Sequence, residues 1–353
     1  MTFDTIIRGG TVATASDTFR SDVGISAGRI TTLGLDLGAA RQVIDATDRL
    51  VLPGGIDSHV HISQPNGPGI VIADNFESGT RAAAFGGNTM VLPFCLQERG
   101  QSLGQAVRDY HAKADGNCCV DVSFHLIISD PTEQVLGQEL PALIKDGYTS
   151  FKVFMTYEDL ALSDRQILEV MSVARETGAL VMVHAENFDA IRFLTDRLER
   201  AGKTAPRGRT SFRWVPNGIP DIETRLPILF SEGVSKGRID LNRFVALSAT
   251  NHDKTYGLYP RKGTIAVGSD ADIAIWDPKR EVTISQQILH HGADYTPYEG
   301  LRVTGWPMTT LVRGEVVVSD GALTGRKDHG QHLARDISSF APPLVSAGTY
   351  VHG

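Results

Sequence analysis

Four side chains that could bind a metal ion stand in or at the end of short apolar runs. His59 and His61 are one residue apart in the run 55–62. If this run is a β-strand, both imidazoles point to the same face, because side chains alternate along a strand. Lys152 and His184 belong to two later apolar runs. Imidazoles suit zinc or a similar divalent ion, so the pattern predicts a metal site at the ends of several strands.

Lys152 is unusual because it lies within an apolar run, where a buried ammonium is costly. Carboxylation of its amine by carbon dioxide would give a carbamate with two oxygens, each able to bind a metal ion. Taken alone, a lysine at a strand end more often keeps its ammonium in solvent, and an isolated His-x-His pair is more often structural. The combination of His59, His61, Lys152 and His184 favours the ligand interpretation. His125 is interpreted as a packed core histidine.

The middle of the chain alternates candidate strands with candidate helices. The expected strands are 55–62, 89–94, 120–127, 150–154 and 180–184. Between the last two, Ser163 or Asp164 can cap a helix that stops before Gly178. The apolar residues expected on one stripe of this helix are Ile167, Leu168, Met171 and Ala174. The next expected helix has a stripe formed by Ile191, Leu194 and Leu198, and it stops at Gly202.

Repeated strand–helix units predict a parallel sheet covered by helices. Ionisable residues at strand carboxyl ends are typical of a (β/α)8 barrel, so we predict an α/β fold of this type for residues 53–259. Glycine-punctuated β-branched runs near both chain ends predict one β-sandwich built from residues 1–52 and 260–325. Residues 326–353 are expected to form a C-terminal tail.

The composition restricts the class of partner. The formal net charge of -7 argues against a nucleic-acid surface, which needs concentrated Lys and Arg. No apolar run reaches the roughly 18 residues of a membrane span, and three cysteines are too few for a disulfide framework. We therefore expect a cytoplasmic protein that acts on a small molecule, without nucleic acid or membrane. A homo-oligomer, a dimer or tetramer, is a separate expectation that the composition does not test.

The motifs around these residues resemble the cyclic amidohydrolases of the dihydropyrimidinase and hydantoinase family. The resemblance rests on runs 54–61, 82–94 with Gln97, 152–157, 184–187, 216–220 and 256–276. It implies that His59 and His61 bind one metal, that His184 binds a second, and that Lys152, as N6-carboxylysine, bridges the two. The expected cofactor is a pair of Zn²⁺ ions.

The same resemblance implies roles for two further residues. Tyr157 would act in catalysis and substrate binding by donating a hydrogen bond to the oxyanion of the tetrahedral intermediate. The backbone of Asn217 would bind the ring amide of the substrate. The implied reaction is metal-assisted hydrolysis of dihydropyrimidines or 5-substituted hydantoins to N-carbamoyl amino acids.

The chain departs from the family pattern after residue 206. About five strand–helix units precede this point, and residues 207–213 then lead directly to the run 214–217 that follows the barrel in the family. Roughly three units, on the order of 90 residues, are absent. They would carry a further metal-binding histidine, a serine and an acid–base aspartate. His252 and Asp253 are nearby residues of suitable type, and we do not expect them to take over these roles.

Two alternatives to an active hydrolase stay open at this point. The shortened chain could be a catalytically impaired homologue that acts only as an assembly or structural partner, because its barrel would keep two unpaired edges. The deletion could also be an artefact of sequence assembly.

Overall fold

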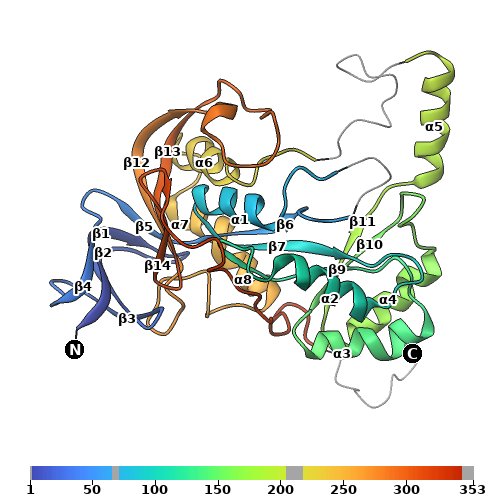
Figure 1. The fold of residues 1–353 in the computed structure, drawn as a ribbon, viewed down its shortest axis with the longest axis horizontal. Helices are drawn as coiled ribbons and strands as arrows, with labels where there is room; N and C mark the ends of the chain where they lie inside the picture. The colour runs from blue at the N-terminus through green and yellow to red at the C-terminus, as the bar shows by residue number, and fades with distance from the viewer. Residues whose placement is uncertain (1, 66–70, 204–217, 344–353) are drawn as a thin grey trace, which may run out of the picture.

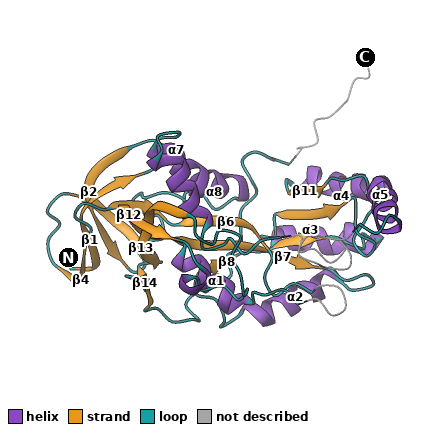
Figure 2. Ribbon diagram, turned by 90° about the horizontal axis from the view of Figure 1, so that it is seen from above, coloured by secondary structure: helices purple, strands orange, loops and turns teal. Residues whose placement is uncertain are grey.

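Two β-sheets lie end to end in an elongated molecule (Figures 1 and 2). The computed structural model describes residues 2–65, 71–203 and 218–343. One sheet is mainly antiparallel and contains strands from both ends of the chain, whereas the other is parallel and is built from the middle of the chain.

The first sheet has the order β15-β14-β13-β12-β5-β1-β2-β3, with β4 also paired to β1. Its strands are β1 (Phe3–Ala13), β2 (Thr18–Ser26), β3 (Arg29–Gly34), β4 (Ala40–Asp45), β5 (Leu50–Pro53), β12 (Ile273–Thr283), β13 (Arg302–Val312), β14 (Glu315–Ser319) and β15 (Ala322–Leu323). The antiparallel pairing of β5 with β12 joins the two chain ends, as the sequence predicts. Buried β-branched side chains such as Ile7, Val23 and Ile275 form its core.

The parallel sheet has the order β11-β10-β9-β7-β6, with the short β8 paired to β7. Its strands are β6 (Gly55–Val60), β7 (Asn88–Leu96), β8 (Asp121–Val122), β9 (His125–Ile127), β10 (Ser150–Phe154) and β11 (Leu180–His184). All the predicted strands are present, but the run 120–127 is split into β8 and β9. Between the two strands, the carbonyl of Phe124 accepts a hydrogen bond from the side chain of Arg335 at 2.7 Å.

Helices alternate with these strands. They are α1 (Phe76–Phe85), α2 (Leu103–Ala114), α3 (Leu140–Lys145), α4 (Asp164–Thr177) and α5 (Phe188–Arg200), followed by α6 (Arg225–Leu229), α7 (Leu241–Val245) and α8 (Asn251–Tyr256). Short π-helical turns occupy η1 (Val135–Glu139), η4 (Phe230–Ser235) and η5 (Ala246–Thr250), and a 3-10 turn is η6 (Gln286–Ile288).

Helix α4 confirms both predicted boundaries. The side chain of Ser163 accepts a hydrogen bond from the N–H of Gln166, and Gly178 ends the helix at φ +80°. The apolar stripe expected for this helix is only partly buried, because Leu168 and Met171 are exposed. The residues of α4 that face the core are Ile167, Val170 and Ala174, at i, i+3 and i+7.

The two faces of the parallel sheet pack differently. Val91 of β7 points outward into the core shared with the helices, whereas Met90 and Leu92 point to the inner face. The inner face is covered there by Leu258, just beyond α8, and by Leu333 of the C-terminal segment. These residues cover the inner face at the amino-terminal half of the sheet. Other side chains line the inner face at its carboxyl-terminal half.

Part of the segment expected to be a C-terminal tail packs on this sheet. The backbone N–H of Val122 donates to Gln331 O at 3.0 Å, and the N–H of Leu333 donates to Val122 O at 2.8 Å. Leu333, Arg335 and Ser338 are buried. We call residues 331–338 the C-terminal strap.

Helix α5 is present as expected, but its apolar side is not covered. Its predicted stripe of Ile191, Leu194 and Leu198 is exposed, and no residue of α5 is buried. Figure 1 shows α5 beyond β11, at the end of the molecule opposite to the antiparallel sheet. Among the described residues, β11 pairs only with β10, so the helix stands beside an open sheet edge. No helix within the described ranges has the length and apolar character needed to cross a membrane.

Candidate active site

Three of the predicted ligands meet around one aromatic ring, that of Phe94 near the end of β7. The ring centroid of His59 lies 4.7 Å from that of Phe94, and the ring of His61 stacks on Phe94 at 4.9 Å. The Lys152 Nζ lies 5.7 Å from the same centroid. Parallel pairing of β6 with β7, and of β10 with β9, brings these residues to one end of the sheet. The geometry agrees with the expectation that they share a site.

Lys152 is buried, with only 7% of its surface exposed, and no described carboxylate forms an ion pair with it. Its Nζ lies between two apolar rings, 5.5 Å from Phe154 and 5.7 Å from Phe94. Burial lowers the pKa of Lys152, because desolvation disfavours the ammonium. A lowered pKa raises the fraction of neutral amine, which is the form that reacts with carbon dioxide.

His59, in β6, and His61, just after it, are held in the neutral form that binds metals. Desolvation of the ring, followed by the charges on Lys152 and His61, lowers the pKa of His59 to about 4. Burial of the ring also lowers the pKa of His61. His61 Nδ1 lies 2.7 Å from the side-chain oxygen of Gln64, which can only accept, so Nδ1 carries the proton. The Nε2 lone pair of His61 is therefore available to a metal ion.

His184 and Tyr157 form the neighbouring part of the site. His184 stacks on Phe154 with ring centroids 5.5 Å apart, and its Nε2 pairs with the carboxylate of Glu186. This contact leaves Nδ1 as the nitrogen available for coordination. The ring of Tyr157 lies 5.2 Å from that of His184.

Tyr157 adopts a backbone conformation that is rare for a large side chain, with φ +74°. Such conformations persist where the surrounding structure enforces them, often at functional sites. Burial, followed by the charge of Glu186, raises the pKa of Tyr157, so its hydroxyl stays protonated at neutral pH. Tyr157 can therefore donate a hydrogen bond to an oxyanion.

The sequence singles out three further residues. Asn217 lies outside the described residues. His252 does not turn toward the ligands, because its Nδ1 lies 2.9 Å from Ser58 Oγ and its Nε2 lies 2.9 Å from Leu247 O. His125 is fully buried and packed, as predicted.

The donors present fit a divalent metal ion on one condition. Within the described ranges, no group of three His, Cys, Asp or Glu side chains is placed to hold a metal ion. His59 and His61 supply two neutral imidazoles, and Lys152 adds a buried amine without a counter-ion. Carboxylation of Lys152 would turn that amine into the missing oxygen ligand.

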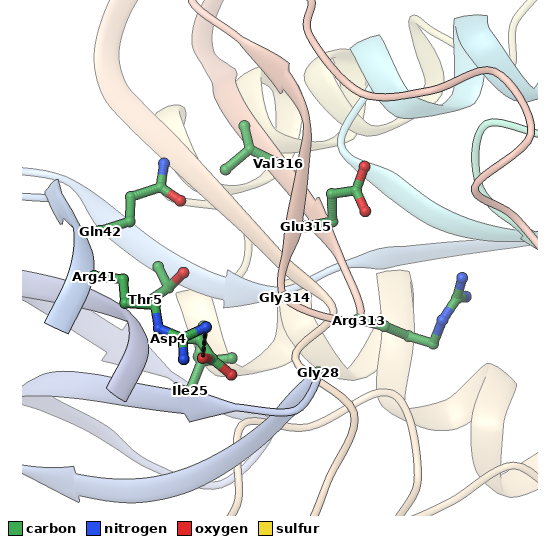
Figure 3. Close-up of a pocket in the computed structure, with 10 residues that line it drawn as sticks. All are labelled: Asp4, Thr5, Ile25, Gly28, Arg41, Gln42, Arg313, Gly314, Glu315 and Val316. Carbon is green, nitrogen blue, oxygen red and sulfur yellow. Dashed lines mark ion pairs between the residues drawn. The ribbon is translucent and has the colours of Figure 1, made fainter. Parts of the chain in front are cut away.

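A pocket of about 490 Å³ lies elsewhere, at the antiparallel sheet. Figure 3 shows that its lining comes from β1, β2, β4, β14 and the turns that follow β2 and β13, and that Asp4 and Arg41 form an ion pair there. Arg313 points away from this pocket, toward Asp121. It contains no histidine or cysteine, so we do not assign the chemistry to it.

Comparison with known proteins decides the family. The model of the Amidohydrolase family matches residues 50–210 and 217–317. This chain belongs to that family. It is 36% identical to the D-hydantoinase of Geobacillus stearothermophilus, over 94% of this chain and 96% of the relative. It is also 28% identical to the dihydropyrimidinase of Rattus norvegicus, over 94% of this chain and 88% of that protein.

Solved structures agree with this placement. A structure of a D-hydantoinase superposes on this amidohydrolase with a TM-score of 0.92 at 34% identity, covering 95% of this chain and 100% of the other. A dihydropyrimidinase from Brevibacillus agri gives 0.91 at 34% identity, covering 94% of this chain and 99% of the other. The family and these relatives imply a metal-dependent enzyme.

For three residues of the site in this amidohydrolase, the sequence analysis predicts no role. Phe94 lies at the end of the family run 82–94, and strand alternation from Leu92 places it on the inner face. Glu186 follows His184 by two residues, a spacing that could have suggested a contact. Arg335 gave no signal, because its partners come from residues more than 180 positions away.

Proposed function

We propose that this chain hydrolyses cyclic amides, opening dihydropyrimidines or 5-substituted hydantoins to N-carbamoyl amino acids. The observation that carries the proposal is the meeting of His59, His61 and Lys152 around Phe94 in a chain that is 36% identical to a D-hydantoinase. Relatives named D-hydantoinase and dihydropyrimidinase support this substrate class.

The proposed cofactor is zinc, held by His59, His61, carboxylated Lys152 and, for a second ion, His184. When bound, zinc would lower the pKa of water to about 7 and polarise the ring carbonyl. The remaining chemistry belongs to the protein. Phe94 and Phe154 keep water from the Lys152 amine, and Glu186 orients the His184 ring.

In the proposed substrate complex, the hydroxyl of Tyr157 donates a hydrogen bond to the carbonyl oxygen as negative charge develops there. Removal of one such donor typically costs about 10²- to 10³-fold in kcat. The backbone of Asn217 is proposed to bind the ring amide. The ring opens when a water oxygen bonds to the carbonyl carbon and the C–N bond breaks; the oxygen stays in the new carboxylate, and a proton from the water goes to the nitrogen.

We also propose that the late strand–helix units of the family are absent from this chain. The alignment with the Geobacillus relative runs over 454 positions, whereas this chain has 353 residues. The described parallel sheet, which ends at β11 on one side, is consistent with this proposal. Without the acid–base aspartate of those units, we expect turnover to be slower by about 10²- to 10⁴-fold than in a complete relative.

The proposal includes the domain limits of the sequence analysis: a sandwich from residues 1–52 and 260–325, and a metal-dependent domain from residues 53–259. The free, buried cysteines Cys95, Cys118 and Cys119 support a cytoplasmic location. We further propose a homo-oligomer, a dimer or tetramer. The open edge of β11 and the exposed apolar stripe of α5 support self-association.

Metal analysis of the purified chain, coupled to ring-opening assays, tests the proposed function. Dihydrouracil and a 5-substituted hydantoin are the substrates, and the N-carbamoyl product is quantified. We expect bound zinc and measurable product from the wild type, and neither from Lys152→Gln. Absence of product from wild-type protein that contains zinc would refute the enzymatic assignment.

A further inference from the structure

His125, at the start of β9, is fully buried, and both of its ring nitrogens have partners. Its Nδ1 lies 2.6 Å from Ser150 Oγ, and its Nε2 lies 2.9 Å from the carbonyl oxygen of Ser58. Ser58 directly precedes His59. His125 therefore connects the start of β10 with the backbone that carries a predicted metal ligand.

The chemistry of the partners fixes the direction of each hydrogen bond. A carbonyl oxygen can only accept, so His125 Nε2 carries a proton and donates it to Ser58 O. The neutral ring then has an unprotonated Nδ1, which accepts from the Ser150 hydroxyl. Burial, together with the charge of Arg335, holds the pKa of His125 well below its usual range, in agreement with a neutral ring.

The other end of this chain of hydrogen bonds is the guanidinium of Arg335. Its Nη1 donates to Ser150 Oγ at 2.7 Å, its Nε donates to Ser123 Oγ at 2.8 Å, and its Nη2 donates to Phe124 O at 2.7 Å. The residue is buried in the C-terminal strap. Because Ser150 Oγ accepts from Arg335, its own proton is directed to His125.

The backbone at His59 is restrained from both sides of one peptide bond. Its carbonyl side, Ser58 O, accepts from His125, and its amide side, His59 N–H, donates to Asp57 Oδ1 at 3.3 Å. The Ser58 hydroxyl also donates to His252 Nδ1 at 2.9 Å, because His252 Nε2 donates to Leu247 O. Rotation of the His59 backbone would break these contacts.

We propose that Arg335, Ser150 and His125 form a positioning relay that sets the orientation of His59 for metal binding. The relay passes from the strap through the amino-terminal end of the sheet to the strand that carries His59. All three are positioning residues, because they act through the Ser58–His59 peptide bond. The proposal rests on the proposed metal-dependent function and names residues outside its ligand set.

Ser150→Ala tests the relay, with Ser123→Ala as a matched control. Each variant removes one buried hydroxyl that accepts from the same Arg335, but only Ser150 continues to His125. We expect Ser150→Ala to weaken Zn²⁺ affinity by about 10- to 100-fold, as for other residues that orient metal ligands. We expect Ser123→Ala to keep wild-type affinity, although both variants lower the melting temperature. Equal Zn²⁺ affinities for the two variants would overturn the relay.

A second measurement uses metal-free protein and does not depend on enzymatic activity. In ¹⁵N spectra of histidine-labelled protein, His125 is expected as the Nε2–H tautomer in the wild type and in Ser123→Ala. Ser150→Ala is expected to show a changed Nδ1 shift. A wild-type ring protonated on Nδ1 contradicts the relay. If the wild type binds zinc without opening rings, the proposed function fails while the affinities still decide the relay.

Discussion

Lys152 and Lys262 are both buried, but their electrostatic surroundings are opposite. Lys262 Nζ pairs with Asp272, lies 2.8 Å from Asp121 Oδ2 and lies 3.7 Å from Asp270 Oδ2. Against the effect of burial, Asp272 and Asp121 raise the pKa of Lys262. Lys152 faces two phenylalanine rings, has no described carboxylate partner, and has a lowered pKa. Lys262 is thus a structural cation, whereas Lys152 is suited to lose its charge.

This contrast predicts that metal loading depends on carbon dioxide. Metal-free wild-type protein is expected to take up zinc when bicarbonate is supplied and to take up much less when it is removed. Lys152→Gln should take up little zinc in either case, because it cannot form a carbamate. Elemental analysis after desalting provides the measurement, and Lys145→Gln, on the surface of α3, provides the control. Equal loading with and without bicarbonate argues against carboxylation.

Glu186→Gln tests the contact of Glu186 with His184. The carboxylate holds Nε2 of the ring and leaves Nδ1 free for a metal ion. We expect the variant to lose about 10- to 100-fold in metal affinity or activity, because the ring loses its orienting partner. Chelator competition measures the affinity. Glu158→Gln, an exposed residue nearby in the chain, should behave as wild type.

Tyr157→Phe tests the proposed oxyanion contact. We expect kcat to fall by about 10²- to 10³-fold with little change in KM, since the hydrogen bond strengthens only as charge develops. Tyr259→Phe, at an exposed tyrosine, should leave both constants unchanged. A rise in KM alone would show instead that Tyr157 only binds substrate.

Because His332 of the C-terminal strap is buried, we expect the protein to lose stability in acid. Burial, followed by the charges of His111 and Arg335, lowers the pKa of His332 to about 3, and its buried Nε2 has no hydrogen-bond partner among the described residues. The unfolded chain takes up this proton near pH 6.5, so stability falls as the pH drops from there toward 3. The ring packs against His111, Phe124 and Tyr148.

His332→Phe should therefore make the free energy of unfolding less dependent on pH between 6.5 and 3. Urea unfolding at several pH values measures the slope of the free energy of unfolding against pH. The slopes of the wild type and the variant should differ least above pH 7. An unchanged slope in the variant would show that other groups cause the acid sensitivity.

The exposed stripe of α5 predicts self-association. Leu194→Lys should reduce the average mass in solution, because it places a charge within the stripe of Ile191, Leu194 and Leu198. The fold should persist, since no residue of α5 is buried. Light scattering coupled to size exclusion measures the mass. Asp196→Lys, on the opposite side of the helix, is the control, and equal effects of both variants would speak against this contact.

The sequence predicted the ends of an element well where the contacts that fix those ends join residues close in the chain. Ser163 and Gly178 mark the ends of α4, because caps act within one helical turn. The ends of β10 and β11 were also predicted as found. Helix α5 is present with the expected apolar side, but Ile191 and Leu198 are exposed, because periodicity shows that a helix has an apolar side and cannot show what covers it.

The sequence by itself determined the chemistry that could occur, since His59, His61, Lys152 and His184 are recognisable by type and spacing. Only the tertiary structure decided how these groups are held. Three of them lie around Phe94, Lys152 is buried without a described carboxylate partner, and Arg335 reaches His125 through Ser150. These contacts join residues far apart in the chain, so their existence depends on packing that no local pattern encodes.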